Sequence, residues 1–423
     1  MDRLRVIGGT SLTGAVRIDG AKNAALPILA ATILGDSPSI IRNVPPLSDV
    51  KTMLSILESL GAVCSFDMEN NVITVDPTTI NNYTAPYDLV RKMRGSICVL
   101  GPLIGKFGKG TVSFPGGCVI GQRPIDLHLK GLRALNVSMN INHGYIEAST
   151  DDLRGNVVFL GGRFGSSVLA TANIMLAAVK AKGTTVIESA ACEPELVDLA
   201  NFLKAMGAKI DHAGAHSITI EGVQNLDGVD YTVIPDRIEA GTYILAGAIT
   251  RSKVTIENII KEHLWALNDI LTHSGVLIET KDNSITVDAR SGIFKPLDIT
   301  TLPYPGFPTD LQAQMMAFMI SVKGISVITE KIFPDRFMHI AELNRMAADI
   351  SLEHATAIIK GGTPLSGAPL MASDLRASAA LVLAGLIAQG ETVINRIYHL
   401  DRGYYKMEEK LRSLGAQIER IPE

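Results

Sequence analysis

Apolar and polar positions repeat along the 423-residue chain with a spacing of about 70 residues. Each copy contains a long apolar segment, a loop, an amphipathic segment that ends at a small residue, and then strand-like alternation. The small residues that mark the six copies are Gly61, Asn136, Gly207, Gly275, Ala347 and Gly415. Successive markers lie 68 to 75 residues apart, so six units account for nearly the whole chain.

The third unit shows which elements each copy predicts. In order, these are a buried helix, a strand, an amphipathic helix and a strand pair, at 170–181, 184–188, 195–206, and Ile210 with 218–220. Gly183 and Gly207 follow the two helices, where glycine commonly ends a helix. The last unit predicts the same order at 377–389, 392–394 and 405–414.

Because every unit mixes helix and strand, the sequence predicts an α/β fold. We expect the apolar helices to bury one another and the sheets to lie outside. Aromatic residues are only 5% of the chain, which favours close packing of helices rich in Ala and Gly. A division between Gly228 and Pro235 would place three units on each side.

Composition removes several classes of function. The net charge of −4 disfavours a nucleic-acid-binding protein, which usually carries a strongly basic surface. Four scattered cysteines without C-x-x-C spacing argue against a disulfide scaffold and a zinc site. The first residues lack the apolar core of a signal peptide, and the longest apolar runs are too short for a membrane span. We therefore expect a soluble cytoplasmic protein with no nucleic-acid or membrane partner.

The segment around Lys22 and Asn23 carries the first candidate chemistry. A lysine at the start of a helix can bind an oxyanion or a phosphate, because the free N–H groups and the helix dipole add to the ammonium charge. The alternative is a solvated lysine beside an asparagine that caps the helix.

A glycine-rich loop, 115–124, holds Cys118 among three glycines, with Arg123 five residues further on. Glycine lets the backbone approach a ligand, and a nearby cation lowers the pKa of a thiol. Cys118 is thus a candidate acid or nucleophile. The alternative is a small buried cysteine in a tight turn.

Asp310 and Asp374 each stand just before an apolar helix-like segment. Asp310 could act as a general base, whereas the alternative is an aspartate that caps the helix. Arg376 and Arg402 could hold a phosphate or carboxylate with two hydrogen bonds, or could form surface salt bridges. No phosphate-binding P-loop is present, and the Gly161–Gly165 stretch does not match G-x-G-x-x-G, so a nucleotide cofactor is disfavoured.

Taken together, these segments resemble the enolpyruvyltransferase family, most closely the branch that acts on UDP-N-acetylglucosamine. The matching stretches are Asp19–Ala24, Pro115–Cys118 with Gly121 and Arg123–Pro124, Ala191–Glu195, Pro308–Asp310, Arg336–Phe337, Asp374–Ala377 and His399–Gly403. They stand in the family's order over nearly the whole chain. One stretch departs: the family commonly has Ser-Val-Gly-Ala-Thr-Glu-Asn where this chain has Ser167-Val168-Leu169-Ala170-Thr171-Ala172-Asn173.

The resemblance implies a two-domain inside-out α/β barrel of six βαβαββ repeats, with helices buried and sheets outside. It places 22–234 in the first domain and 1–21 plus 235–423 in the second, so that the first strand completes the second domain. The active site would lie in the cleft between them.

The resemblance also implies the reaction. The enolpyruvyl group of phosphoenolpyruvate passes to the 3′-hydroxyl of UDP-N-acetylglucosamine and phosphate is released, by addition and elimination. This would be the first committed step of bacterial peptidoglycan precursor synthesis. No metal or organic cofactor is implied, and Cys118 would be the residue that the epoxide fosfomycin modifies.

Residue roles carried over from the family fall into three groups. The catalytic group is Cys118 as acid and Asp310 as base, with Lys22 and Arg402. The cations around phosphoenolpyruvate are Lys22, Arg94, Arg123, Arg376 and Arg402, with Asp374 beside them. The residues expected at the nucleotide sugar are Asn23, Arg123, Pro124, Ile125, Asp126, Leu127, Ser167, Val168, Asp310 and Ile332.

Two other functions compete with this interpretation. One is the shikimate-phosphate enolpyruvyltransferase, which shares the six-unit architecture but is disfavoured by Cys118 and by Lys22–Asn23. The other is a catalytically silent paralogue that senses a ligand or regulates a partner. The altered 161–172 segment leaves room for it, whereas retention of the catalytic residues argues against it.

Overall fold

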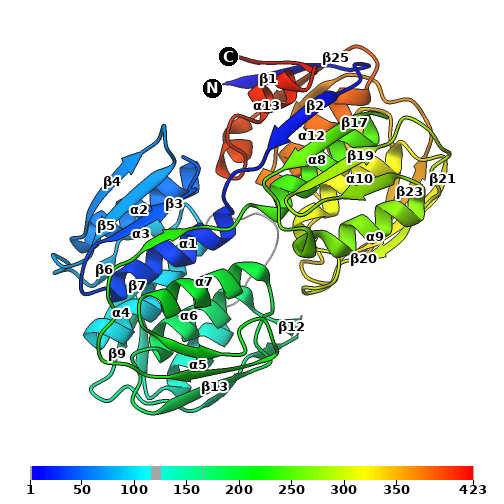
Figure 1. Ribbon diagram of the computed structural model, residues 1–423. Helices are drawn as coiled ribbons and strands as arrows, with labels where there is room; N and C mark the ends of the chain where they lie inside the picture. The colour runs from blue at the N-terminus through cyan, green and yellow to red at the C-terminus, as the bar shows by residue number, and fades with distance from the viewer. Residues whose placement is uncertain (1, 116–124, 164, 423) are drawn as a thin grey trace. The chain divides into compact units, whose positions relative to one another are not determined.

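The computed structural model describes residues 2–115, 125–163 and 165–422 (Figure 1). It divides into two compact units. Apart from positions inside 116–124, unit 1 comprises Met1–Asp19 with Pro235–Glu423, and unit 2 comprises the chain between Gly20 and Ile234. The chain thus passes between the units after Asp19 and after Ile234, whereas the expected first boundary lay after residue 21.

Among the described residues, unit 2 contains three four-stranded sheets with one shared topology. In each sheet an edge strand runs parallel to its neighbour, and the other two strands are antiparallel. In spatial order the sheets are β16 (Asp230–Thr232), β3 (Ser39–Arg42), β5 (Val72–Asp76) and β4 (Val63–Asp67); β6 (Thr84–Ala85), β7 (Lys109–Ser113), β9 (Tyr145–Ser149) and β8 (Ser138–Asn142); and β10 (Val157–Phe159), β13 (Thr184–Glu188), β15 (Ser217–Glu221) and β14 (Lys209–Asp211). Strands β11 (Gly161–Gly162) and β12 (Gly165–Ser166) form a separate hairpin.

Unit 1 repeats this topology three times in the part of the chain that is described. Its sheets are β2 (Thr13–Arg17), β17 (Lys253–Glu257), β19 (Ser284–Asp288) and β18 (Leu277–Thr280); β20 (Asp298–Thr300), β21 (Gly324–Thr329), β23 (Thr356–Gly361) and β22 (Asp349–Glu353); and β24 (Pro369–Met371), β25 (Glu391–Asn395), β1 (Arg3–Ile7) and β26 (Gln417–Ile421). The prediction of a mixed α/β fold is therefore confirmed.

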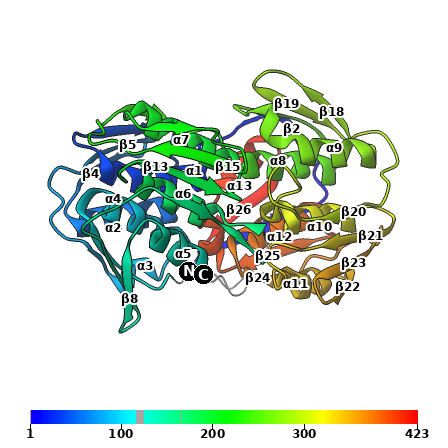
Figure 2. The ribbon, with the colours of Figure 1, turned by 90° about the horizontal axis from the view of Figure 1, so that it is seen from below.

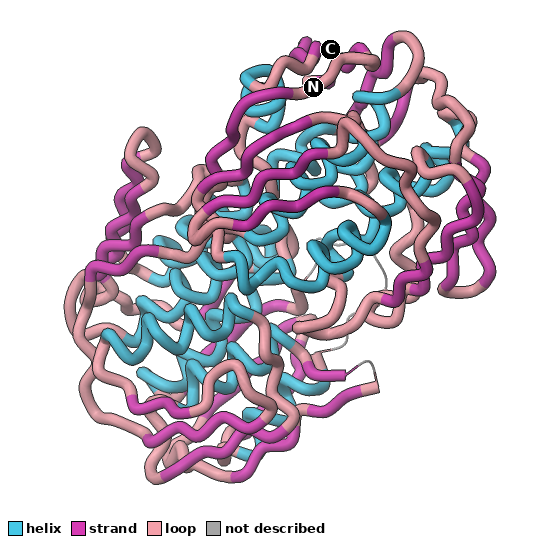
Figure 3. The backbone as a smooth tube through the Cα atoms, turned by 45° about the vertical axis from the view of Figure 1, so that its right-hand side comes forward, coloured by secondary structure: helices cyan, strands magenta, loops and turns pink. Residues whose placement is uncertain are grey.

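Helices connect the strands in both units, and in each unit the sheets lie against the helices (Figure 3). Those of unit 2 are α1 (Lys22–Ala31), α2 (Ser48–Leu60), α3 (Tyr87–Val90), α4 (Leu100–Phe107), α5 (Asp126–Ala134), α6 (Val168–Ala178) and α7 (Pro194–Ala205), with 3₁₀ turns at Thr32–Leu34 and Arg94–Val99. Those of unit 1 are α8 (Arg237–Ile249), α9 (Trp265–Ser274), α10 (Gln312–Ile320), α11 (His339–Arg345), α12 (Leu375–Ile387) and α13 (Met407–Ser413), with 3₁₀ turns at Lys261–Leu264, Thr309–Leu311 and Ile397–Arg402.

Segments from the two ends of the chain complete the last sheet of unit 1. Strand β1 pairs antiparallel with both β25 and β26, with Leu4 opposite Ile394 and Arg420. The two chain ends consequently lie side by side (Figures 1 and 2). Strand β2 likewise runs parallel to β17, more than 200 residues away. Unit 1 therefore depends on residues 3–17 for two of its sheets.

Most predicted elements match, and one helix ends earlier than expected. Strand β13 has the predicted bounds and α7 lies within one residue of them. Helix α6, predicted to run to residue 181, ends at Ala178. The carbonyl of Val179 accepts a hydrogen bond from the N–H of Val223, and residues 180 and 181 close tighter i→i−3 turns. A long-range backbone contact thus replaces the last helical turn.

In the described part of the chain, no helix combines the length and the apolar character needed to cross a bilayer.

Close helix packing in unit 2 rests on Gly101 of α4. A methyl group at this position would lie 2.2 Å from the main-chain oxygen of Asn173 in α6. The Gly101 N–H also donates to the Asn173 Oδ1, at 2.6 Å. The glycine is therefore what lets these two helices touch through their backbones.

We expect Gly101→Ala to lower the free energy of unfolding by about 1–3 kcal/mol, because the helices must separate. Gly247→Ala is the matched control, since Gly247 also lies inside a helix but a methyl group there would meet its nearest neighbour at 3.5 Å. It should be neutral or slightly stabilising. Thermal and denaturant unfolding of both variants tests the pair, and an equal loss in both would contradict the packing argument.

Candidate active site

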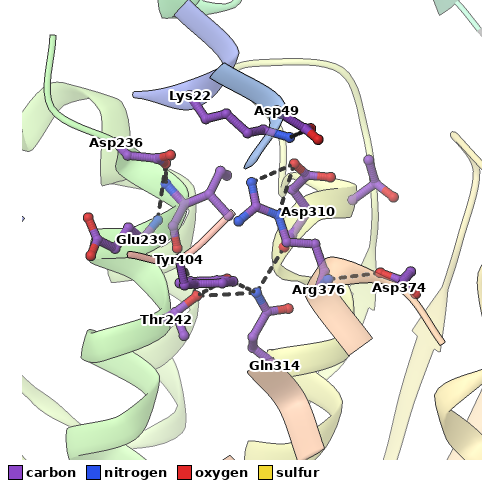
Figure 4. A network of polar contacts seen from close by, with 12 residues as sticks. Lys22, Asp49, Asp236, Glu239, Thr242, Asp310, Gln314, Asp374, Arg376 and Tyr404 are labelled. Carbon is purple, nitrogen blue, oxygen red and sulfur yellow. Dashed lines mark hydrogen bonds and ion pairs between the residues drawn. The ribbon is translucent and has the colours of Figure 1, made fainter. Parts of the chain in front are cut away.

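Asp310 lies between two buried guanidinium groups in unit 1, of which Figure 4 shows that of Arg376. Its Oδ1 accepts a hydrogen bond from Nη1 of Arg336 at 2.8 Å. Its Oδ2 accepts from Nε and Nη2 of Arg376, at 3.2 and 3.1 Å. The alternative that Asp310 caps a helix is wrong, because neither the 309–311 turn nor α10 has a side-chain cap. The carboxylate instead forms a cluster of ion pairs with Arg336 and Arg376.

Burial makes this cluster electrostatically strong. The side chains of Arg376 and Arg336 are 1% and 5% exposed, whereas that of Asp310 is 26% exposed. Burial opposes the charged form of Arg376, but the interactions with Tyr404 and Asp310 outweigh it and raise the pKa of Arg376. Both arginines are thus cations, and they favour the ionised form of Asp310, whose side chain is partly exposed.

The N-terminus of α12 presents Arg376 because Asp374 caps that helix. Its Oδ1 accepts hydrogen bonds from the N–H groups of Arg376 and Ala377, at 2.8 and 3.1 Å. For Asp374 the helix-cap alternative is therefore confirmed. The whole residue is 6% exposed. Burial lowers the pKa of the neighbouring His339 to about 4, although the charge of Asp374 opposes this.

Glu330 shapes the loops around Asp310 and Ile332. Its Oε1 accepts hydrogen bonds from the N–H of Ile332 at 2.7 Å and from the hydroxyl of Thr301 at 2.7 Å. Its Oε2 accepts from the hydroxyl of Thr309 at 2.8 Å. One buried carboxylate thus fixes the segments that precede Asp310 and that carry the half-buried Ile332.

Arg402 ends the 397–402 turn and is half-buried. Its neighbour Asp401 pairs with Arg420 through two hydrogen bonds, at 2.6 and 3.1 Å. The same Arg420 donates to Glu408 at 2.8 Å. Asp401 thus anchors this turn to β26.

In unit 2, Lys22 is the first residue of α1 and is buried, with 6% of its surface exposed. Its Nζ lies 3.2 Å from Oδ2 of Asp49, a 4% exposed residue in the first turn of α2 (Figure 4). The alternative of a solvated lysine is therefore wrong. Asn23 is exposed and does not cap α1, because Ala21 occupies the cap position without a side-chain bond.

Residues expected at the nucleotide sugar begin two helices of unit 2. Asp126 is the exposed first residue of α5, with Ile125 buried before it and Leu127 half-buried after it. Ser167 caps α6 by accepting a hydrogen bond from the N–H of Ala170 at 3.3 Å, and the half-buried Val168 follows. Arg94, which is expected among the cations around phosphoenolpyruvate, begins the 94–99 turn and is half-buried. Cys118, Arg123 and Pro124 lie outside the described residues.

His128 of α5 is buried against the side-chain amide of Asn173 in α6. Its Nδ1 lies 3.1 Å from Nδ2 of Asn173, which also donates to the carbonyl of Ile97. An amide nitrogen donates, so the Nδ1 of His128 accepts and the ring is neutral. Burial, with a smaller contribution from the charge of Arg94, lowers the pKa of His128 from 6.5 to about 3.

A histidine whose pKa is depressed on folding stabilises the fold above pH 6.5, and this stabilisation is lost as the pH falls toward about 3. His128→Gln should therefore be less stable than the natural chain at pH 7. At pH 4 the difference in free energy of unfolding between the two proteins should be smaller by roughly a few kcal/mol, because only the natural chain has a histidine at this position that gains a proton on unfolding. Unfolding at the two pH values measures this, with the exposed His273→Gln as control. A deficit independent of pH would contradict a neutral buried His128.

Within the described residues, no group of three or more His, Cys, Asp or Glu side chains could hold a metal ion.

Four residues of these contacts, and of the hydrogen bond from Gln314 Nε2 to the Tyr404 hydroxyl at 3.0 Å, have no role predicted from the sequence. Arg336 was quoted only as part of a matching stretch, although it is a direct partner of Asp310. Asp49, Gln314 and Tyr404 carried no signal, because each is an ordinary polar residue in a helix or turn. Pairing across 26 to 90 residues is not visible in local spacing.

Comparison with known proteins agrees with the fold. The sequence model of the family described as EPSP synthase (3-phosphoshikimate 1-carboxyvinyltransferase) matches residues 6–411. Among solved structures, the enolpyruvyl transferase NikO from Streptomyces tendae has a TM-score of 0.90 at 26% identity, covering 100% of this chain and 99% of that one. EPSP synthase from Acinetobacter baumannii, at 18% identity with a TM-score of 0.77 and full coverage of both chains, shares the fold.

Curated relatives are closer in sequence. UDP-N-acetylglucosamine 1-carboxyvinyltransferase 2 of Carboxydothermus hydrogenoformans is 53% identical over 422 residues, which is 100% of both chains. UDP-N-acetylglucosamine 1-carboxyvinyltransferase of Methylacidiphilum infernorum is 51% identical over 421 residues, 100% of this chain and 99% of that one. With full-length identity at this level and a family match over most of its length, the chain belongs to the enolpyruvyltransferase (carboxyvinyltransferase) family.

Proposed function

We propose that this chain transfers the enolpyruvyl group of phosphoenolpyruvate to the 3′-hydroxyl of UDP-N-acetylglucosamine and releases phosphate. The observation that carries this assignment is identity above 50% over the full length of enzymes named for that acceptor. The likeness to shikimate-phosphate enzymes is far lower in sequence, at 18%. The product would enter bacterial peptidoglycan precursor synthesis.

The reaction needs two proton transfers and several cations. The sugar 3′-oxygen adds to C2 of phosphoenolpyruvate, its proton is removed, and another proton is placed on C3. Loss of phosphate together with a proton from C3 then restores the double bond. Asp310 is suited to accept the hydroxyl proton, because it pairs with the cations Arg336 and Arg376 and its side chain is 26% exposed.

The family pattern assigns the remaining roles. Cys118 would supply the proton to C3. The charge on the phosphate and carboxylate would be neutralised by Lys22, Arg94, Arg123, Arg376 and Arg402. Arg376 contacts Asp310, and its side chain is 1% exposed. In the same proposal, each unit corresponds to one inside-out barrel of three repeats.

Acceptor choice tests the assignment. The full chain is mixed with phosphoenolpyruvate and either UDP-N-acetylglucosamine or shikimate 3-phosphate, and phosphate release is measured. We expect release with the nucleotide sugar alone. Release with shikimate 3-phosphate alone would support the other branch of the family, and release with neither would support a silent paralogue.

A further inference from the structure

The hydroxyl of Tyr404 joins three segments of unit 1 that are distant in sequence (Figure 4). It lies 2.8 Å from the hydroxyl of Thr242 in α8 and 3.0 Å from Nε2 of Gln314 in α10. Tyr404 itself follows the turn that ends at Arg402, and it is 2% exposed. Because the side chain is buried, it can influence a substrate only through other residues.

The donors and acceptors of the hydrogen bonds around Tyr404 can be assigned. The hydroxyl of Thr242 donates to the carbonyl of Ile238 at 2.8 Å, so its oxygen accepts the proton of Tyr404. The Tyr404 oxygen then accepts from Gln314 Nε2. The same nitrogen also donates to the main-chain oxygen of Asp310 at 3.0 Å and to the hydroxyl oxygen of Thr242 at 3.2 Å, so its two protons are shared among three acceptors. A carbonyl only accepts, so the amide of Gln314 is held in this orientation.

Tyr404 therefore acts on both partners of the central ion pair. Together with Thr242, it holds the Gln314 amide that donates to the main-chain oxygen of Asp310. Its ring lies beside the guanidinium of Arg376, with the Cζ atom 5.3 Å from the ring centroid, within the range of a cation–π contact. Arg376 in turn donates two hydrogen bonds to the Asp310 carboxylate.

We propose that Tyr404 is a positioning residue, which sets the orientation of the Asp310 carboxylate toward the acceptor hydroxyl without touching the substrate. The inference rests on the proposed function for its kinetic consequence. A misplacement of a base by about 1 Å can cost about 100-fold in rate. The hydroxyl of Tyr404, more than its ring volume, is what this role requires.

Tyr404→Phe tests the role, because it keeps the ring and removes only the hydroxyl. We expect kcat to fall about 10- to 100-fold, while KM for either substrate changes by less than about three-fold. Weaker pairing of Asp310 with Arg376 disfavours the ionised carboxylate, so the acid limb of the pH–rate profile should move to higher pH.

Tyr243→Phe is the matched control. The Tyr243 hydroxyl is fully buried in α8 and has no hydrogen-bond partner among the described residues. Tyr243 directly follows Thr242 in α8, and Tyr243→Phe likewise removes only a hydroxyl. This variant should leave kcat and the pH profile unchanged. Equal kinetic losses in both variants, or a Tyr404→Phe enzyme with the natural kcat and pH profile, would overturn the proposal.

Crystal structures of both variants give a readout that does not depend on turnover. We expect Asp310 to turn away from Arg376 in Tyr404→Phe and to keep its contacts in Tyr243→Phe. Retained contacts in both would overturn the positioning role even if the natural chain transfers enolpyruvyl groups. If the natural chain shows no transfer, the proposed function fails, and the structures still decide whether Tyr404 orients Asp310.

Discussion

Asp310→Asn is expected to lower kcat by about 10²- to 10⁴-fold, the usual contribution of a general base. The amide is nearly isosteric, but it cannot take the proton of the acceptor hydroxyl. The change also removes one carboxylate that balances the buried charges of Arg336 and Arg376. Removing one partner of a buried ion pair costs about 3–5 kcal/mol, so the free energy of unfolding should fall as well.

Separate measurements distinguish these two effects. Phosphate release at saturating substrate gives kcat, and denaturant unfolding at the same temperature gives stability. Asp269→Asn serves as control, since Asp269 is exposed on α9, and it should change neither quantity. A stable, fully active Asp310→Asn enzyme would remove Asp310 from the mechanism.

Lys22→Gln has the second-largest expected effect. A preorganised cation opposite developing charge contributes about 10²- to 10³-fold, so kcat/KM for phosphoenolpyruvate should fall by that amount. The variant also removes the ammonium group that lies 3.2 Å from the buried carboxylate of Asp49, so the protein should be less stable. Kinetics with phosphoenolpyruvate varied at saturating nucleotide sugar measures the loss.

A double variant separates the chemistry of Lys22 from its part in the fold. Lys22→Gln with Asp49→Asn removes both charges of the buried pair and should recover most of the stability without recovering activity. Lys51→Gln, on the exposed face of α2, is the charge-matched control and should be unaffected. If activity returned together with stability in the double variant, Lys22 would be a structural residue only.

The sequence anticipated the repeated elements because they depend on local patterns. The alternating residues of β13 and the apolar stripe of α7 are read within a few positions, and the structure has both. The early end of α6 was missed because Val179 pairs with Val223 from another part of the chain. The pairing of β1 with β25 and β26 is likewise a long-range contact that no local pattern encodes.

The candidate site was anticipated in part for the same reason. Asp310 and Arg376 stand in motifs, so the resemblance could select them. Their mutual ion pair, and its extension through Arg336, come only from the folded unit. Gln314 and Tyr404 form their contacts inside the core and have no motif of their own. Physical contact, more than motif membership, therefore identifies the residues that orient the base.

We expect this chain to move an enolpyruvyl group onto UDP-N-acetylglucosamine, with Asp310 as the base. Mass spectrometry of the nucleotide sugar after incubation with phosphoenolpyruvate tests it most directly. We predict that the sugar gains one enolpyruvyl group with the natural chain, and far more slowly with Asp310→Asn. A nucleotide sugar of unchanged mass, or phosphate released without transfer, would contradict the claim.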